Sequence, residues 1–316
     1  MLVNKHPNKT IVYAGSDAFS IQPLKKLLSL KYKKITVLTR PPKRQGRGMK
    51  QKNNPLAEFA LHNNLETLMP ESPNDNDFLI KLQENKYDLL ISCAYGRIMS
   101  KKLFGCFHMD NINIHPSLLP RWRGPSPVES SILEGDKITG VSLMQMTEEL
   151  DAGPVYEQRS ISMNGENTKT LSEKLALLAG DMIESFLPSF FEGDVKAIQQ
   201  DERLVTQSKI IKKEDARVDW NEPSEVIDSK IKAYYPWPVA YTYLDDKYLR
   251  ILDSEAILED EDNTDPGQIV DINNEGVTVK CKGGKIILKG IQPEGKKEML
   301  AADFARGNKL EGRRFS

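Results

Sequence analysis

Three polar side chains in the middle of the chain form the set best suited to chemistry. Asn113 and His115 alternate within residues 111–115, a run that predicts a strand with both side chains on one face. Asp151 follows a second predicted strand at residues 140–146. A carboxamide, an imidazole and a carboxylate can together move a proton and stabilise an oxyanion. The residue types alone leave a structural role open, because single histidines at strand ends and Asp-Ala-Gly-Pro turns are common.

The segment directly after His115 has proline at both ends, and proline restricts the backbone. The segment consists of Pro116, Ser117, Leu118, Leu119 and Pro120. We expect it to form a rigid loop that shapes a pocket beside the polar set.

A strongly basic segment lies at residues 40–52, which hold six Lys or Arg and no acid. Its prolines and glycines predict an irregular loop between a strand and a helix. One interpretation is a mobile, solvated loop. The other is contact with phosphate groups, because a guanidinium can bind a phosphate with two hydrogen bonds.

The elements that must position these residues follow a strand–helix–strand pattern. Residues 10–14 and 35–39 predict strands on either side of a helix, and residues 87–93 form a nearly continuous apolar strand. The first ~200 residues therefore predict a Rossmann-like, doubly wound α/β domain. Ligands of such sheets bind beyond the carboxyl ends of the strands, where Asn113 and His115 are expected.

The usual nucleotide fingerprints are missing from this predicted domain. The turn after the first strand reads Gly15-Ser16-Asp17-Ala18-Phe19 instead of the glycine pattern that binds dinucleotides. The chain also lacks a P-loop sequence. We therefore expect no NAD or FAD.

A long helix is predicted from Thr170, because Thr170 and Glu173 have the spacing of a capping box. After this long helix, the sequence predicts one further helix near residues 227–234. Short β-rich runs separated by turn residues follow it. This pattern predicts a small antiparallel β-barrel, of OB type. The expected domains are residues 1–200 and 209–316, with a linker at 201–208.

The overall composition excludes several classes of protein. The 44 Lys and Arg balance 45 Asp and Glu, so the chain is not a uniformly basic nucleic-acid binder, although residues 276–316 hold ten Lys or Arg against four acids. No stretch approaches the ~20 apolar residues that span a membrane. Three distant cysteines and four histidines suggest neither disulfides nor a metal site. We expect a cytoplasmic, soluble monomer.

The central sequence resembles folate-dependent formyltransferases. The resemblance rests on Asn113-Ile114-His115, the SLLPRWRG run that begins at Ser117, the GVSLMQM run and the LDAGP run around Asp151. Further similarities follow in the same order along nearly the whole chain, among them the QPEGKK run at residues 292–297. Within the family the chain is most similar to the members that act on methionyl-tRNA.

This resemblance implies a reaction in which 10-formyltetrahydrofolate donates a formyl group to the α-amine of methionine on initiator tRNA, for translation initiation. It implies that Asn113, His115 and Asp151 are catalytic, with Asn113 and His115 donating to the oxyanion and Asp151 holding the imidazolium. It implies a folate-binding role for Ser117, Leu118, Leu119 and Pro120. Contact with the tRNA is implied for the basic segment and expected at Arg40, Lys43, Arg44, Arg47 and Lys50, and the basic C-terminal region would add a second RNA surface.

Two kinds of alternative remain open on the sequence. Another formyltransferase of the family could act on an amino sugar nucleotide or a purine-pathway glycinamide, and the hydrolase-like domain of formyltetrahydrofolate dehydrogenase has a similar plan. A non-catalytic RNA-binding module would use the α/β domain only as a scaffold. Turnover of a formyl donor would separate the enzymes from the binding module.

Overall fold

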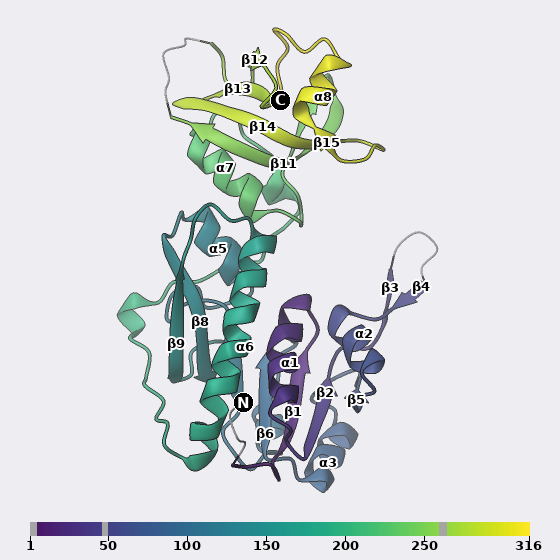
Figure 1. Cartoon of the computed structure of the whole chain (residues 1–316), viewed down its shortest axis with the longest axis vertical. Coiled ribbons are helices and arrows are strands. Elements are labelled where there is room, and N and C mark those ends of the chain that lie inside the picture. Colours follow the sequence, from purple (N-terminus) through teal and green to yellow (C-terminus); the bar gives the residue numbers. More distant parts are fainter. Residues whose placement is uncertain (1–4, 46–49, 259–263) are drawn as a thin grey trace. The chain divides into compact units, whose positions relative to one another are not determined.

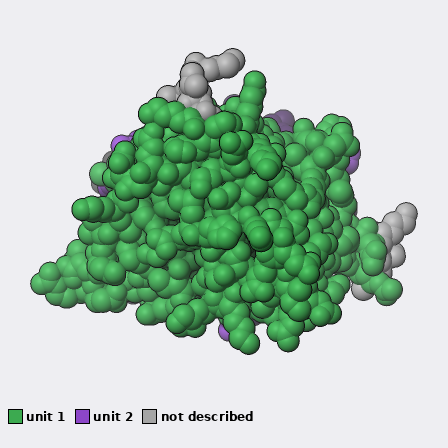
Figure 2. Space-filling view, turned by 90° about the horizontal axis from the view of Figure 1, so that it is seen from below, with its two compact units in different colours: residues 1–124, 138–161, 172–207 green, residues 125–137, 162–171, 208–316 purple. Residues whose placement is uncertain are grey.

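The computed structural model describes residues 5–45, 50–258 and 264–316 of the chain. It divides into two compact units, which are coloured separately in Figure 2. The N-terminal unit comprises residues 1–124, 138–161 and 172–207, and the C-terminal unit comprises residues 125–137, 162–171 and 208–316. Two short stretches from the middle of the sequence thus belong to the C-terminal unit.

A seven-stranded sheet forms the centre of the N-terminal unit (Figure 1). Its strand order is β5-β2-β1-β6-β7-β8-β9, and the first five of these strands are parallel. Strand β8 is antiparallel to β7. The predicted Rossmann-like sheet is confirmed, with an antiparallel addition at one side. The strands are β1 (Thr10–Gly15), β2 (Lys34–Leu38), β5 (Thr67–Leu68), β6 (Leu89–Cys93), β7 (Ile112–His115), β8 (Ile138–Gln145) and β9 (Val155–Ser162).

Helices cover both faces of this sheet, which explains why its central strands are apolar throughout. On one face α1 and α6 lie side by side (Figure 1), joined by ion pairs from Lys26 to Asp181 and Glu184. On the other face, residues of α3 and α4 share an apolar cluster with β1 and β6. The helices of this unit are α1 (Ile21–Ser29), α2 (Pro55–His62), α3 (Asn76–Asn85), α4 (Lys101–Phe104) and most of α6 (Thr168–Glu192).

The turn after β1 needs glycine for packing. A Cβ added at Gly15 would lie 2.8 Å from both the Cys93 carbonyl oxygen and the Ser20 Cβ. The close approach of β1, β6 and the following helix therefore explains this glycine without a bound dinucleotide.

The long helix α6 begins at Thr168, two residues before the predicted start. Asn167 accepts a hydrogen bond from the backbone N–H of Thr170 at 3.0 Å, so the cap is Asn167. The capping-box assignment to Thr170 and Glu173 was wrong, because Asn167 is equally suited to capping and lies at the actual start.

The basic segment forms a hairpin, where an irregular loop was expected. Strand β3 (Lys43–Gln45) pairs antiparallel with β4 (Lys50–Lys52), and Arg44 lies opposite Gln51. Residues 46–49, including Arg47, fall outside the described residues.

A curled antiparallel sheet forms the centre of the C-terminal unit, in the order β10-β11-β14-β13-β12, with β15 beside β14. Residues 313–316 pair with both end strands, because Leu244 bridges Phe315 and Gln268 bridges Arg314. The predicted small antiparallel β domain is therefore confirmed, and its sheet curls into a half-barrel. Its elements are α5 (Pro127–Leu133), α7 (Ser224–Ala233), β10 (Tyr241–Leu244), β11 (Lys247–Ile257), β12 (Ile269–Ile272), β13 (Val277–Cys281), β14 (Gly284–Pro293), β15 (Met299–Leu300) and α8 (Ala301–Arg306).

An aromatic pair packs inside this half-barrel. The rings of Trp220 and Phe315 stack with centroids 5.6 Å apart, and the Trp220 indole N–H donates to the Thr242 hydroxyl at 3.0 Å. None of the helices in the described part of the chain has the length and apolar character needed to cross a membrane.

The three cysteines provide a test of this packing. All are buried and unpaired, and burial raises the pKa of Cys93 and of Cys281 to about 12 and also raises that of Cys106. At pH 8 only about one in 10⁴ of the Cys93 and Cys281 thiols would be the reactive thiolate. We expect an alkylating reagent to leave native Cys93 and Cys281 unmodified while it modifies all three thiols in urea. Rapid labelling of either residue in the native protein would contradict this packing.

Candidate active site

The three polar residues singled out in the sequence meet at the carboxyl end of β7. Asn113 and His115 lie on this strand, and Asp151 lies in the connection between β8 and β9. The Asp151 Oδ1 atom is 3.3 Å from the Asn113 Nδ2 atom and 3.6 Å from the His115 Nδ1 atom. The side chains of His115 and Asp151 are only 5% and 8% exposed. The fold thus brings an amide, an imidazole and a carboxylate together at the edge where this type of sheet binds ligands.

The turn that carries Asp151 has a backbone conformation that few residue types adopt. Asp151 has φ 54°, in the left-handed region that non-glycine residues rarely adopt. The Gln200 side-chain amide donates to the carbonyl oxygens of Asp151 at 2.8 Å and Gly153 at 2.7 Å. A Cβ at Gly153 would lie 1.9 Å from the Gln145 carbonyl oxygen, so this position requires glycine. These constraints fix where the Asp151 carboxylate points.

Both oxygens of that carboxylate accept hydrogen bonds. Oδ1 accepts from Asn113, and Oδ2 accepts from the backbone N–H of Gly124 at 2.9 Å. The second N–H of the Asn113 amide has no acceptor among the described residues, which leaves one donor for a ligand.

The hydrogen bonds of His115 indicate where its protons lie. The Nε2 atom is 2.9 Å from the Trp122 carbonyl oxygen, which can only accept, so Nε2 carries a proton. The Nδ1 atom faces Asp151 Oδ1, and that contact is attractive only with a proton between the two atoms. The pair is therefore arranged to hold or pass a proton at this point.

The loop after His115 is tied to the sheet by its backbone. The Ser142 hydroxyl donates to the Ser117 carbonyl oxygen at 2.6 Å and accepts from the Leu119 N–H at 3.1 Å. The Gln158 amide donates to the Leu119 carbonyl oxygen at 2.8 Å, and the Leu119–Pro120 peptide bond is cis. Leu118 and Pro120 are half-buried, so they leave apolar surface against which a flat heterocycle such as a pterin can pack.

An ion pair joins a buried arginine to an exposed glutamate. Arg123 is 2% exposed, and its guanidinium donates to Glu202 at 2.7 and 3.3 Å and to the Gln200 carbonyl Oε1 at 3.0 Å. The hydrogen bond from Arg123 lowers the pKa of Glu202. Arg123 thus orients Gln200, which in turn orients the Asp151 turn.

Tyr95 contributes an unsatisfied polar atom near the same edge of the sheet. It follows β6, the strand beside β7, and its hydroxyl is buried without a hydrogen-bond partner in the described ranges. Burial raises the pKa of Tyr95, so the hydroxyl keeps its proton and can donate.

Three of the basic residues of the sequence analysis lie on the hairpin formed by β3 and β4. Arg40 lies beside the turn at Gly96, where a Cβ added to the glycine would be 3.5 Å from Arg40 Nη1. Lys43 and Arg44 are exposed on β3. Lys50 begins β4, and Arg47 lies outside the described residues.

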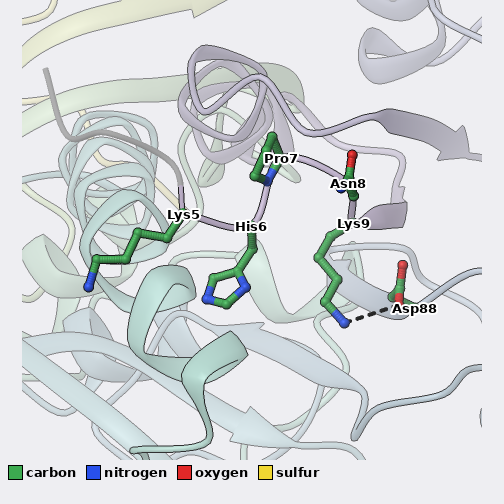
Figure 3. A pocket seen from close by; sticks show the side chains of 6 residues that line it. All are labelled: Lys5, His6, Pro7, Asn8, Lys9 and Asp88. Carbon is green, nitrogen blue, oxygen red and sulfur yellow. Dashed lines mark hydrogen bonds and ion pairs between the residues drawn. The ribbon is translucent and has the colours of Figure 1, made fainter.

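A small pocket of about 270 Å³ lies at the opposite, amino end of the sheet (Figure 3). Asp88 accepts from Lys9 at 3.2 Å and from the Thr10 N–H at 2.8 Å, which fastens the first strand to β6. None of the predicted site residues lines this pocket. Residues 5–45, 50–258 and 264–316 contain no group of three His, Cys, Asp or Glu side chains that could hold a metal ion.

Comparison with known protein families shows to which family the chain belongs. The formyl transferase family matches residues 10–199, and the formyl transferase C-terminal domain matches residues 210–309. The chain belongs to the formyl transferase family. The matched N-terminal region contains Asn113, His115 and Asp151.

Three curated bacterial relatives are named methionyl-tRNA formyltransferase. The protein of Coxiella burnetii (strain RSA 331) is 34% identical over 303 residues, covering 95% of this chain and 96% of its own. That of Buchnera aphidicola (strain Tuc7) is 36% identical over 288 residues, covering 91% and 92%. That of Staphylococcus aureus (strain Newman) is 32% identical over 309 residues, covering 96% and 99%.

Solved structures share the fold at lower sequence identity. HypX from Aquifex aeolicus in complex with tetrahydrofolic acid is 19% identical, with a TM-score of 0.66 over 95% of this chain and 47% of its own. An N-formyltransferase from Helicobacter canadensis, in complex with folinic acid and dTDP-3-aminofucose, is 17% identical, with a TM-score of 0.68 over 90% of this chain and 99% of its own.

The supporting residues Gln200 and Arg123 were missed in the sequence analysis. Gln200 lies 49 residues from Asp151, and a glutamine carries no signal of chemistry. Arg123 stands in the quoted SLLPRWRG run, whose pattern predicts no partner for it.

The amide of Gln200 provides a test of how the Asp151 turn is held. Gln200→Glu keeps the side-chain size but removes the donor to two carbonyl oxygens, each worth about 0.5–1.5 kcal/mol. We expect hydrogen–deuterium exchange of the peptide at residues 145–158 to become about tenfold faster. Gln199→Glu, at an exposed neighbour, is the matched control and should leave exchange unchanged. Equal exchange in both variants would show that Gln200 does not hold the turn.

Proposed function

We propose that this protein transfers a formyl group from 10-formyltetrahydrofolate to the α-amino group of methionine on initiator tRNA, giving N-formylmethionyl-tRNA for translation initiation. The observation that carries the proposal is the 32–36% identity with methionyl-tRNA formyltransferases over at least 91% of the chain. The proposal includes action as a monomer in the cytoplasm.

We assign Asn113 to the oxygen of the formyl group. When the amine attacks the formyl carbon, negative charge develops on this oxygen and needs a donor. The free N–H of the Asn113 amide supports this role, because the other N–H is already fixed by Asp151. One donor of this kind typically contributes ~10²–10³ in rate.

We assign the proton transfer to His115 and Asp151. The attacking amine must lose a proton, and the departing folate nitrogen must gain one. The proximity of His115 Nδ1 and Asp151 Oδ1 supports this assignment, because the carboxylate would stabilise an imidazolium at this position, and that positive charge would favour the oxyanion.

The folate is assigned to the loop formed by Ser117, Leu118, Leu119 and Pro120. When bound, 10-formyltetrahydrofolate supplies an activated formyl carbon. The loop is rigid because its backbone groups bond to Ser142 and Gln158, so it can orient the donor without reorganising.

A formyl-transfer assay tests the function directly. The donor is 10-formyltetrahydrofolate, and the acceptors are methionyl-initiator tRNA, uncharged tRNA and an amino sugar nucleotide. We expect product only with the charged tRNA. Turnover only with the sugar would reassign the acceptor, and no turnover with any acceptor would refute the enzyme.

The catalytic assignments predict large losses of activity with the fold retained. We expect His115→Ala and Asp151→Asn each to lower kcat at least ~100-fold. The matched controls His108→Ala and Glu149→Gln change exposed residues and should keep normal kcat. Near-normal kcat in either site variant would refute its role.

The basic hairpin formed by β3 and β4 predicts that the affinity for tRNA depends on salt concentration. If Lys43 and Arg44 contact tRNA phosphates, the variant Lys43→Ala/Arg44→Ala should bind tRNA more weakly and reduce the slope of log affinity against log salt by roughly 1–2. Arg47→Ala is expected to act in the same direction. Lys33→Ala/Lys81→Ala, at exposed lysines away from the hairpin, is the control. An unchanged slope in the hairpin variant would argue against phosphate contact.

A further inference from the structure

The strand pair β10–β11 of the C-terminal unit carries a group of aromatic side chains on its outer face. Tyr243 pairs with Tyr248 across the two strands, and Tyr241 pairs with Arg250. The alternate residues Thr242 and Leu249 are buried on the inner face. Strand alternation therefore places the three tyrosines and Arg250 together on the outside.

The three tyrosine rings are in mutual contact. The centroids of Tyr241 and Tyr248 are 5.0 Å apart with an interplanar angle of 31°. Tyr243 stands edge-on to both, at 6.0 and 5.9 Å. All three are half-buried, so each leaves part of its ring open. We name Tyr241, Tyr243 and Tyr248 the tyrosine platform.

Two guanidinium groups lie over the platform. The Arg217 guanidinium is 5.7 Å from the Tyr243 centroid, and that of Arg250 is 5.9 Å from the Tyr248 centroid. Both arginines are exposed, and neither forms an ion pair with a carboxylate in the part of the chain that is described. Arg250 donates only to the neutral Gln292 amide, at 3.1 Å.

The carboxylates of Glu214, Asp219 and Asp245 lie near the platform, and none of them forms an ion pair with Arg217 or Arg250 in the described ranges. Asp245, in the turn between the two strands, pairs with Arg313. Glu214 is close enough to contribute to the raised pKa of Tyr241, whose main cause is burial against its neighbours. Tyr241 therefore keeps its proton at neutral pH and adds no negative charge. Lys247 is exposed on the same turn.

A cluster of partly exposed tyrosine rings, flanked by guanidinium groups without a carboxylate partner, is complementary to a nucleotide. An unpaired base can stack on a tyrosine ring, and its phosphate can bind an arginine fork. A base-paired duplex hides its bases from such a surface, and an apolar partner would not use the cations.

We propose that the tyrosine platform binds an unpaired nucleotide of RNA, with the base stacked on the rings and the adjacent phosphate held by Arg217 and Arg250. The inference rests on the proposed function in one respect, that the RNA partner is tRNA. The stacking itself requires only a single-stranded segment.

Binding of a fluorescent 12-nucleotide single-stranded RNA of mixed sequence tests the platform by anisotropy. We expect Tyr243→Ala/Tyr248→Ala to bind about tenfold more weakly or worse. Tyr243→Phe/Tyr248→Phe keeps both rings and should bind within about twofold of the unmodified protein. The same RNA as a duplex should lose little affinity in the alanine variant. Equal affinity of the alanine variant and the unmodified protein for the single strand would overturn the proposal.

The arginines are tested separately with Arg217→Ala/Arg250→Ala. We expect weaker binding of the single strand and a shallower salt dependence, whereas the exposed-site control Arg306→Ala should bind normally. Tight binding of an acidic peptide that is lost in the arginine variant, with RNA binding retained, would assign the surface to a protein partner and refute the RNA proposal.

A kinetic measurement separates this inference from the proposed function. In the formyl-transfer assay, the platform variants should raise the KM for methionyl-tRNA while kcat stays unchanged. If the unmodified protein forms no formylmethionyl-tRNA but the alanine variant loses single-strand binding, the proposed function fails and the platform stands. If the unmodified protein is active and the variants keep both KM and RNA affinity, the platform is refuted and the proposed function stands.

Discussion

The site of this protein depends on one constraint, the fixed position of the Asp151 carboxylate. Asp151 adopts a left-handed backbone conformation that costs free energy, so the surroundings must hold it there. They do so with hydrogen bonds from Gly124, Asn113 and Gln200, which come from three separate parts of the chain. Because the carboxylate is fixed, the His115 ring lies between two oxygen atoms. Its Nε2 atom faces the Trp122 carbonyl oxygen, and its Nδ1 atom faces the Asp151 carboxylate.

Much of this arrangement follows from local sequence pattern. The alternation of Asn113 and His115 on an apolar strand predicts a shared face, and the parallel sheet predicts the edge at which they meet a ligand. Asp151 was expected nearby because it follows the next predicted strand, and the strand order explains its proximity, since β8 pairs directly with β7. The central strands were predictable for the same reason, because burial on both faces leaves a continuous apolar run.

What could not be predicted depends on long-range partners. The antiparallel direction of β8 and the ion pair between the buried Arg123 and the exposed Glu202 are set by tertiary packing, which leaves no periodic signal. The hairpin β3–β4 was missed because its residues are basic and polar, without the alternation that marks a strand. The tyrosine platform could be predicted only in part. Short β-rich runs were expected in this region, but only the pairing register brings Tyr243 beside Tyr248.

The discontinuous C-terminal unit has a consequence for synthesis on the ribosome. Helix α5 buries Val128 and Ile132 within that unit and packs against α7, which begins at Ser224. At ~5–20 residues per second, α7 is translated roughly 5–20 s after α5. During that interval the apolar side of α5 lacks its native partner, while the neighbouring strands of the large sheet can already assemble. The nascent chain therefore carries an exposed helix in the middle of a folding domain, a natural binding site for chaperones.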